Sequence, residues 1–370
     1  MLFQSEKAGY VCIHEHKERF MQQETPKPHK RRVRYKGKYP KKFEEKYKEL
    51  NPEKYQDTIE HVIRKGNTPA GMHISIMVPE ILDFLQIQPG QTGFDATLGY
   101  GGHTRAMLTK LNGHGHIYAT DVDPEESAKT RKRLADLGFG DDILTIRLQN
   151  FCTIDEIARE AGGFDFLLAD LGVSSMQIDN PKRGFSFKID GPLDLRLNQK
   201  KGISAAQRLE TISRDELAGM FYENSDEPYS DEIAKAITDY IRRGNHVDTT
   251  TKLHRIIEET LSFLPEKDRK DTVKKTCQRV FQALRIDVNN EFEVLYEFME
   301  KLPDALKPGG RAAILTFHSG EDKLVKKALK TGYKAGIYSE YSKDVVRPSA
   351  QECAQNPRAR STKMRWAVKA

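Results

Sequence analysis

The hydrophobic pattern along residues 73–170 alternates between two periodicities. Four short apolar or β-branched runs have the composition of strands, and the segments between them carry apolar residues at helical spacing. The runs cover positions 92–97, 116–120, 143–148 and 164–169. The last run is almost wholly apolar, as expected for a strand that is covered on both faces. Strands that alternate with helices at this pace predict a parallel, doubly wound α/β sheet.

A long helical region interrupts this alternation after Asp170. Apolar stripes at helical spacing occur between residues 213 and 261, and Ser213 with Glu216 has the spacing of a capping box. The α/β pattern then resumes with a helix over 292–306, a stop at Pro308-Gly-Gly, a strand over 311–317 and an alternating edge or closing strand over 363–369. We therefore expect an α/β core made of residues 71–176 and 289–370, with a helical insertion over 177–288.

Residues 1–70 form a basic extension outside this core. Between Pro26 and Lys48, eleven Lys or Arg residues stand against two Glu, and four aromatic residues are interleaved. Basic side chains neutralise phosphates and aromatic rings stack on bases, so this stretch is either an RNA-binding arm or a solvated tail. Asn51-Pro52, followed by apolar residues at helical spacing, predicts a short helix before the main domain.

The overall composition argues against a membrane protein. Mean hydropathy is −0.66, and no apolar run approaches the roughly 18 residues that a membrane span requires. We find no secretion signal, and four cysteines without a C-x-x-C pair suggest a reducing cytoplasm. Cys12, His14 and His16 are metal-ligand types, but three residues without a second cluster are a weak signal, and we expect no metal.

The stretch from Phe94 to His103 is the first candidate site. It has the pattern of a buried strand that breaks into a glycine-rich turn and opens a helix. Gly99, Gly101 and Gly102 lack a Cβ where the backbone must either turn sharply or lie against a ligand. The stretch therefore predicts a cofactor loop.

Three aspartates, Asp95, Asp121 and Asp170, lie toward the carboxyl rim of the predicted sheet, where such sheets bind ligands. Asp121 follows Gly101 by twenty residues, the spacing at which an acid reaches ribose hydroxyls in nicotinamide or S-adenosylmethionine enzymes. The loop is not G-x-G-x-x-G, so its pyrophosphate cradle is imperfect. A glycine-rich turn beside an acid suits a cationic donor without phosphate. Capping of the next helix by Asp121 and Asp123 is the alternative.

The stretch from Asp170 to Ser175 is the second candidate site. A carboxylate at a strand tip, followed by a turn at Gly172 and two hydroxyls, suits an amine placed over the methyl group of a donor. An exocyclic amine is a poor nucleophile because its lone pair is delocalised into the ring. Asp170 and Ser174 are therefore candidate catalytic residues that localise this lone pair and take up the proton late. A turn stabilised by its own Asp and Ser side chains is the structural alternative.

Several long stretches of this chain resemble the bacterial small-subunit ribosomal RNA cytosine-N4 methyltransferase family, the MraW type. They are 95–103, 170–177, 183–187, 191–196, 281–286 with Asn289, 316–319 with Glu321 and Asp322, and 356–361. They occur in order over about residues 72–368. The resemblance implies a Rossmann-like class I S-adenosylmethionine-dependent methyltransferase sheet, with an inserted helical domain that grips RNA.

The resemblance also implies a substrate and a donor site. The substrate would be the N4 amine of a cytosine in the decoding centre of 16S rRNA, within the small ribosomal subunit, and no metal is implied. The residues that would bind S-adenosylmethionine are Gly101, Gly102, His103, Asp121, Phe151, Asp170 and Gln177. Phe151 suits packing against adenine, with core packing as the alternative.

Other residues near the same rim are candidates for RNA contact or catalysis. The RNA candidates are Arg183, Phe185, Phe187 and Arg196. The arginines either hold phosphates or pair with nearby aspartates, and the phenylalanines either stack on a flipped base or belong to the core. His318 is either a catalytic residue or a structural histidine, whereas we interpret Arg285 as structural.

The chain departs from the family pattern at Gly320, at Lys323 and along 222–227, and its basic extension is an addition. These departures bear more on which substrate the chain acts on than on which cofactor it binds. Two alternatives therefore stay open: a paralogue that methylates another nucleic-acid site, and an RNA-binding ribosome-assembly factor without turnover. The imperfect loop disfavours a nicotinamide oxidoreductase. We expect a cytoplasmic protein without membrane contact, and the oligomeric state stays open, a dimer included.

Overall fold

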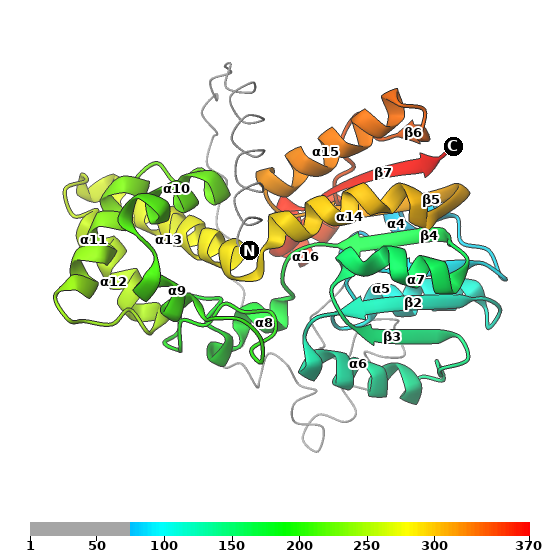
Figure 1. Ribbon diagram of the computed structural model, residues 1–370, viewed down its shortest axis with the longest axis horizontal. Coiled ribbons are helices and arrows are strands. Elements are labelled where there is room, and N and C mark those ends of the chain that lie inside the picture. The colour runs from blue at the N-terminus through cyan, green and yellow to red at the C-terminus, as the bar shows by residue number, and fades with distance from the viewer. Residues whose placement is uncertain (1–74) are drawn as a thin grey trace, which may run out of the picture. The chain divides into compact units, whose positions relative to one another are not determined.

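The computed structural model describes residues 75–370 (Figure 1). The predicted extension over 1–70, with its basic stretch, its short helix and the cysteine and histidines considered as metal ligands, lies outside the described residues. Within residues 75–370, none of the helices combines the length and the apolar character needed to cross a membrane.

A seven-stranded sheet forms the centre of the described chain. Its strands are β1 (Thr92–Asp95), β2 (His116–Asp121), β3 (Leu144–Leu148), β4 (Phe164–Asp170), β5 (Leu306–Thr316), β6 (Tyr338–Tyr341) and β7 (Lys363–Lys369). Their order is β3-β2-β1-β4-β5-β7-β6, with β1 to β5 parallel and β7 antiparallel to its neighbours. The predicted doubly wound α/β fold is confirmed. The strand order reverses between β1 and β4, the switch point at which such sheets bind ligands.

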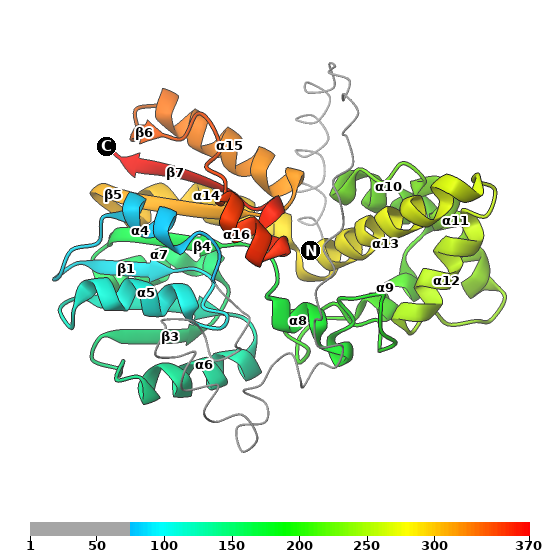
Figure 2. The same cartoon turned by 180° about the vertical axis from the view of Figure 1, so that it is seen from behind.

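Helices cover both faces of the sheet (Figures 1 and 2). One face carries α4 (Val78–Leu85), α5 (Gly102–Leu111) and α6 (Pro124–Asp136), and the other carries α7 (Ile154–Ala161), α14 (Glu291–Ala305) and α15 (Ser319–Lys334). Successive β4 side chains enter opposite cores, with Leu167 on one side and Phe166 and Leu168 on the other. Because both faces are covered, the strand reads as a continuous apolar run.

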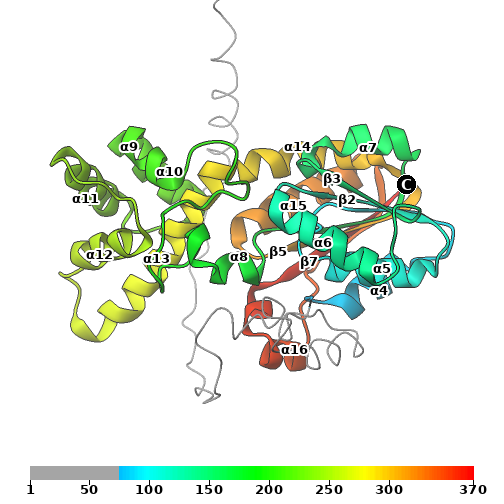
Figure 3. The same cartoon turned by 90° about the horizontal axis from the view of Figure 1, so that it is seen from below.

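Between β4 and α14 the chain first forms the short helix α8 (Ser175–Asp179). The helices that follow pack around a core of their own. They are α9 (Ala205–Thr211), α10 (Arg214–Ser225), α11 (Ser230–Arg242), α12 (Thr250–Thr260) and α13 (Glu266–Asn289). Buried side chains such as Phe221, Ile237 and Ile257 join this core, so the three predicted stripes fall on α10, α11 and α12. Figure 3 shows α13 leading from this cluster to α14 on the sheet. The sequence analysis did not single out the whole of α13, whose exposed first half is rich in charged residues.

The predicted start of β5 is wrong in detail, and β6 is absent from the predictions. β5 begins at Leu306, which pairs with Phe164, and the pairing resumes at Arg311 with Phe166. The expected stop at Pro308-Gly-Gly is therefore an irregularity inside the strand, because Pro lacks the N–H that regular pairing needs. β6 was not predicted, since it is a short edge strand of four residues.

Only half of the predicted capping box forms at α10. The Ser213 hydroxyl accepts a hydrogen bond from the Glu216 N–H at 3.3 Å. The Glu216 carboxylate does not return to Ser213, because it pairs with the Arg208 guanidinium at 2.6 Å. The predicted helix start is correct, and a competing ion pair explains the missing second bond.

Candidate active site

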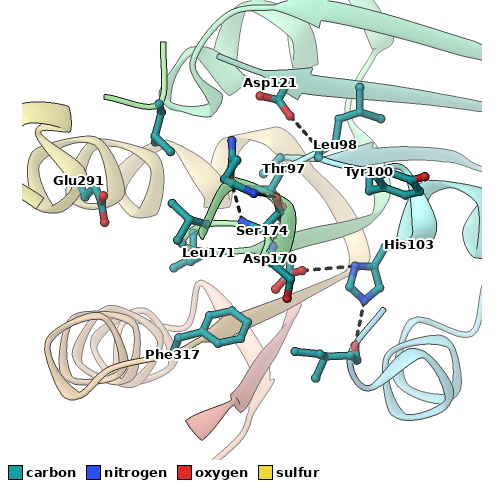
Figure 4. Close-up of a pocket in the computed structure, with 18 of the residues that line it drawn as sticks. Thr97, Leu98, Tyr100, His103, Asp121, Asp170, Leu171, Ser174, Glu291 and Phe317 are labelled. Carbon is teal, nitrogen blue, oxygen red and sulfur yellow. Dashed lines mark hydrogen bonds and ion pairs between the residues drawn. The ribbon is translucent and has the colours of Figure 1, made fainter. Parts of the chain in front are cut away.

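A cavity of about 480 Å³ opens at the carboxyl ends of β1, β2 and β4 (Figure 4). The tips of β3 and β5, the corner between α13 and α14, and the C-terminal turn η5 (Pro357–Ser361) complete its wall. Its wall contains Gly101, Gly102, His103, Asp121, Phe151, Asp170, Ser174 and Gln177. Small-molecule sites commonly enclose about 300–1,000 Å³, so the space suits a nucleoside-sized ligand. The structure thus gathers all the predicted donor-binding residues at one place.

The glycine loop turns through backbone conformations that favour glycine. Gly99 and Gly101 have φ of 48° and 78°, and Gly101 is the N-cap of α5. A Cβ on Gly101 would lie 2.7 Å from Cγ2 of Thr130 on α6. Glycine at Gly101 is therefore required by the backbone conformation and by the close approach of α6.

Asp95 and Thr97 fix the other end of this loop. The buried Asp95 carboxylate accepts hydrogen bonds from the Thr97 N–H at 3.0 Å and from the Thr104 hydroxyl at 2.6 Å. The Thr97 hydroxyl in turn accepts the Asp170 N–H at 2.7 Å. Burial raises the pKa of Asp95 above its ordinary value, although the two hydrogen bonds lower it. Asp95 lies beneath the loop, so it ties β1 to α5 while Thr97 ties β1 to β4.

Asp121 ends β2 and faces the cavity. Its carboxylate accepts the N–H groups of Gly99 and Asp123, each at 2.8 Å. Burial raises its pKa to about 6, although these hydrogen bonds lower it. A carboxylate has about four acceptor positions, so Asp121 has capacity for ligand hydroxyls. The capping alternative holds for Asp123, which accepts the N–H groups of Glu125 and Glu126 at the start of α6.

Asp170 ends β4 with one carboxylate oxygen unpaired. Among the described residues, buried Oδ1 has no hydrogen-bond partner, while Oδ2 lies 3.5 Å from Nδ1 of His103. Burial raises the pKa of Asp170 to about 6; the charge of His103 lowers it, and those of Asp95 and Glu321 raise it further. A buried acceptor without a partner is uncommon and costly. Oδ1 therefore marks the place where a ligand donor is expected.

His103 continues a short chain from Asp170 to the backbone (Figure 4). Its Nε2 lies 2.9 Å from the carbonyl oxygen of Ile76. Because a carbonyl only accepts, we assign the hydrogen to Nε2, which leaves Nδ1 facing the Asp170 carboxylate. Two facing acceptors would repel each other, so one proton must lie on Nδ1 or on Asp170 Oδ2.

A capping box at the start of α8 fixes Ser174 and Gln177. The Ser174 hydroxyl accepts the Gln177 N–H at 3.2 Å, and the Gln177 amide oxygen accepts the Ser174 N–H at 2.9 Å. The Gln177 amide group also donates to Asp123 Oδ2 at 3.2 Å. Local hydrogen bonds thus account for Ser174, as the structural alternative predicted, and Gln177 links α8 to the tip of β2.

Comparison with known proteins identifies the family of this chain. A family model described as the MraW methylase family matches residues 70–370. The chain belongs to this family. With the strand order given above, it has the predicted Rossmann-like class I methyltransferase fold, and the cavity lies where that fold holds its ligands.

Curated relatives are similar to this chain over most of its length. Ribosomal RNA small subunit methyltransferase H 1 of Agathobacter rectalis is 83% identical over 344 residues, 93% of this chain and 99% of that protein. The protein of the same name from Lachnoclostridium phytofermentans is 70% identical over 342 residues, 92% of this chain and 93% of that protein. Ribosomal RNA small subunit methyltransferase H of Bacteroides fragilis is 35% identical, over 80% of this chain and 97% of that protein.

Solved structures show weaker similarity. An S-adenosylmethionine-dependent O-methyltransferase from Thermotoga maritima aligns with a TM-score of 0.38 and 12% identity, over 85% of this chain and 71% of that chain. A putative rRNA methylase from Clostridium thermocellum aligns with a TM-score of 0.38 and 13% identity, over 80% and 97%. At these scores the structural similarity carries no argument about function.

Arg183 lies inside the protein, so its placement favours the ion-pair alternative over the predicted contact with RNA. Only 7% of its side chain is exposed, and its guanidinium lies 2.6 Å from Asp123 Oδ2. The same group donates to the carbonyl oxygens of Arg196 and Leu197 at 3.2 and 2.7 Å. These contacts join Arg183, in the turn just after α8, to Asp123 beyond the end of β2 and to the loop at 196–197, although its buried Nε has no hydrogen-bond partner among the described residues.

The other RNA candidates also have partners within the protein. Arg196 forms a two-pronged ion pair with Asp194, with both contacts at 2.8 Å. Phe187 stacks on His254 with ring centroids 5.7 Å apart, and both Phe185 and Phe187 pack against the core of the helical cluster. None of these three residues lines the described cavity, so the geometry favours the ion-pair and core alternatives over RNA contact.

His318 has the geometry of a structural histidine. It is the N-cap of α15, where its Nδ1 accepts the Glu321 N–H at 3.5 Å, and its Nε2 lies 3.2 Å from Glu321 Oε1. Burial would raise the pKa of Glu321, but His318 and Arg285 outweigh it and hold that pKa below its ordinary value. His318 does not line the described cavity. The predicted catalytic role is therefore not supported by its placement.

The sequence analysis assigned no contacts to several residues that complete the cavity wall. Asn289 donates to the Leu195 carbonyl and accepts the Leu197 N–H, at 2.8 and 2.7 Å. Arg285 is structural, as interpreted, and pairs with Glu291 at 2.8 Å. Asn289 and Arg285 lie in stretches that carry the family resemblance, but their partners are unrecognisable without the fold.

Proposed function

We propose that this chain transfers a methyl group from S-adenosylmethionine to the N4 amine of a cytosine in small-subunit ribosomal RNA. Membership of the MraW methylase family and the names of the relatives support rRNA as the acceptor. The unpaired Oδ1 of Asp170 supports an amine as the reacting group, because a carboxylate oxygen accepts an N–H. We infer a cytoplasmic location, since small ribosomal subunits are assembled there.

The cavity residues fit S-adenosylmethionine. Asp121 has acceptor capacity for the ribose hydroxyls. The ring of Phe151 lies in the cavity wall, and it packs in a T-shaped arrangement with Phe298, with ring centroids 5.1 Å apart. The carboxylates of Asp121 and Asp170 place negative charge around a cationic sulfonium. When bound, the donor supplies an electrophilic methyl group on positively charged sulfur.

Asp170 prepares the acceptor amine. A hydrogen bond from one N4–H to Oδ1 localises the nitrogen lone pair and aims it at the methyl carbon. A bound donor would supply the methyl group and keep the electron pair of its carbon–sulfur bond, and Asp170 would take up the N4 proton that the acceptor loses. His103 Nδ1 lies 3.5 Å from the other carboxylate oxygen of Asp170, Oδ2, and so positions this carboxylate. A carboxylate with a pKa of about 6 is a better base near neutral pH than an ordinary aspartate.

The fold contributes by holding the two reactants in line. The Thr97 hydroxyl accepts the backbone N–H of Asp170 at 2.7 Å and so holds Asp170 in place. The glycine loop would hold the donor. Alignment of this kind accounts for about 7–11 kcal/mol of the barrier in well-oriented reactions. Both candidate carboxylates project from rigid strand tips, which are suited to holding the reactants in line.

Tritium transfer from labelled S-adenosylmethionine to small ribosomal subunits tests the proposal. Digestion to nucleosides should yield labelled N4-methylcytidine, and Asp170→Asn should reduce its yield by about 10²–10⁴ while donor binding persists. A different methylated nucleoside would identify a paralogue with another substrate. RNA binding without any thermal shift from the donor would identify an assembly factor without turnover. Either result would replace the proposal.

A further inference from the structure

Five lysines form one face of α15. They are Lys323, Lys326, Lys327, Lys330 and Lys334, and all five are exposed. At 3.6 residues per turn they fall within an arc of about 100° on the helix. The buried residues of α15 lie on the opposite side, against the sheet. The exposed lysines and the buried residues therefore lie on opposite sides of α15.

Four of these lysines have no acidic partner within the described residues. Lys323, Lys326, Lys330 and Lys334 make no ion pair within 4.0 Å there, whereas the lysines and arginines of other helices commonly do, as Lys301 does with Glu297. Amphipathic helices usually intersperse both signs on the solvent face. The lysine face therefore carries an uncompensated positive charge.

The acids that belong to α15 are turned away from this face. Glu321 is buried and pairs with His318. Asp322 is buried and pairs with Lys363 and Arg365 of β7 at 2.9 and 2.6 Å. Because both carboxylates are engaged below the helix, neither screens the lysines above it.

The neighbouring helix bounds the lysine face on one side. α14 packs beside α15 on the same face of the sheet (Figures 1 and 2) and exposes Glu293, Glu300 and Asp304. These acids repel phosphates, so a polyanion would be confined to α15. A uniformly basic surface would lack this boundary.

The helix that carries the lysine face begins at the cavity wall. Phe317 and Glu321, at the entry to α15, line the cavity wall, and Lys323 stands just after them. From Lys323 to Lys334 the helix rises by about 16 Å, which covers several phosphates of an RNA strand. A strand that places one nucleotide in the cavity would thus have its flanking backbone within reach of α15.

We infer that the lysine face of α15 is a docking surface for the phosphate backbone of RNA, separate from the helical cluster over α9–α13. This inference rests on the proposed function for the identity of the polyanion. Lysines act as compact point charges and suit contacts that position a backbone without reading its sequence. The surface therefore contributes affinity and orientation, and leaves base selection to the cavity.

Charge reversal with a matched control tests the surface. The variant is Lys323→Glu with Lys326→Glu and Lys330→Glu in the full chain. The control is Lys110→Glu with Lys129→Glu and Lys132→Glu on α5 and α6, which makes the same charge change on the opposite face of the sheet. Binding to small ribosomal subunits is measured at several salt concentrations.

The α15 variant should bind small subunits at least tenfold more weakly, and the slope of log K against log salt should fall by about 2, near 0.7 for each lost phosphate contact. The control should bind like the wild type. Equal binding by the α15 variant, or equal loss by the control, would overturn the inference. If the charge-reversal variant does not fold, the Lys→Gln triple takes its place, with a smaller loss expected.

A short RNA separates this inference from the proposed function. Methyl transfer to a short RNA that carries the target cytosine, too short to reach α15, should proceed with unchanged kcat in the α15 variant, while KM for intact subunits rises. Absence of transfer by the wild type, with binding still dependent on α15, would refute the proposed function and keep the surface. Normal transfer with binding independent of α15 would refute the surface alone.

Discussion

The Arg183 guanidinium and the Asp123 carboxylate lie 2.6 Å apart inside the protein. Asp123 caps α6 and follows Asp121 at the tip of β2, whereas Arg183 stands in the chain just after α8. Arg183 also holds the carbonyl of Leu197, which lines the cavity. This buried ion pair therefore holds the tip of β2, which lies in the cavity wall, next to the segment that leads into the helical cluster.

Removing either partner of this pair should destabilise the protein. Arg183→Met leaves the Asp123 carboxylate buried without a counter-charge, and we expect a loss of about 3–5 kcal/mol in the free energy of unfolding. The double variant with Asp123→Asn should lose clearly less than the sum of the two single variants, because no unpaired charge remains. Urea denaturation measures all three values. Strict additivity would show that the pair is not coupled.

Asp170→Asn separates chemistry from stability. The amide keeps the shape of the side chain but takes up no proton, so we expect methyl transfer to fall by about 10²–10⁴. The free energy of unfolding should stay equal or rise, since burial disfavours the charged carboxylate. Asp141→Asn, at a carboxylate that is 90% exposed, is the control and should change neither quantity. Parallel loss of fold and activity would make Asp170 a structural residue.

Methyl transfer should increase with pH as Asp170 ionises. The folded pKa of Asp170 is raised from 3.8 to about 6, so the base form grows between about pH 5 and 7. Rates measured with saturating donor over this interval should follow that rise, and the residual activity of Asp170→Asn should not. Saturation is needed because Asp121, on the donor side, also has its pKa raised to about 6. A flat profile in the wild type would exclude Asp170 as the base.

Stability should move in the opposite direction over the same range. A carboxyl whose pKa is higher in the folded state binds its proton more tightly there, so its contribution is fully present below the unfolded pKa near 3.8. The contributions of Asp121 and Asp170 are lost as the pH rises to about 6. Asp170→Asn should therefore flatten the dependence of unfolding free energy on pH between 4 and 6, measured by urea denaturation. An unchanged slope would contradict the raised pKa.

The fold and the glycine loop could be predicted because their signals are local. The apolar run over β4 and the glycines at Gly99 and Gly101 act through the backbone around them, and the structure bears out the strand and the turn. β6 was missed since four residues at a sheet edge carry little periodicity. Pattern reading succeeds where neighbours along the chain decide the conformation.

The partners of charged residues could not be predicted in the same way. Arg183 pairs with Asp123, sixty residues earlier, and Asn289 bonds to Leu195 and Leu197, more than ninety residues earlier. An arginine that holds phosphate and an arginine that holds a buried carboxylate look alike in sequence. Only the fold favours one of them, which is why the sequence left both alternatives open for the RNA candidates, while the donor candidates lie together in the wall of one cavity.

Gly101→Ala tests whether close packing, beyond backbone conformation, shapes the donor loop. Gly101 and Gly113 both have φ of 78°, but a Cβ at Gly101 would lie 2.7 Å from Thr130 Cγ2, whereas Gly113 has open space. Both alanine variants should carry the strain of a left-handed residue, about 1–2 kcal/mol. Gly101→Ala should lose more stability than Gly113→Ala and should weaken donor binding, measured by calorimetry.

Thr130→Ser resolves the origin of that additional loss. Serine removes Cγ2 and keeps the hydroxyl that donates to the Gly99 carbonyl at 2.6 Å. In the Thr130→Ser background, Gly101→Ala should therefore cost only about as much stability as Gly113→Ala does. If stability recovers while donor affinity stays low, the added methyl group contacts the ligand itself, and the loop backbone must approach the donor directly. If neither recovers, the Thr130 methyl group is not the contact that shapes this loop, since Leu134 of α6 still lies 3.2 Å from the added Cβ.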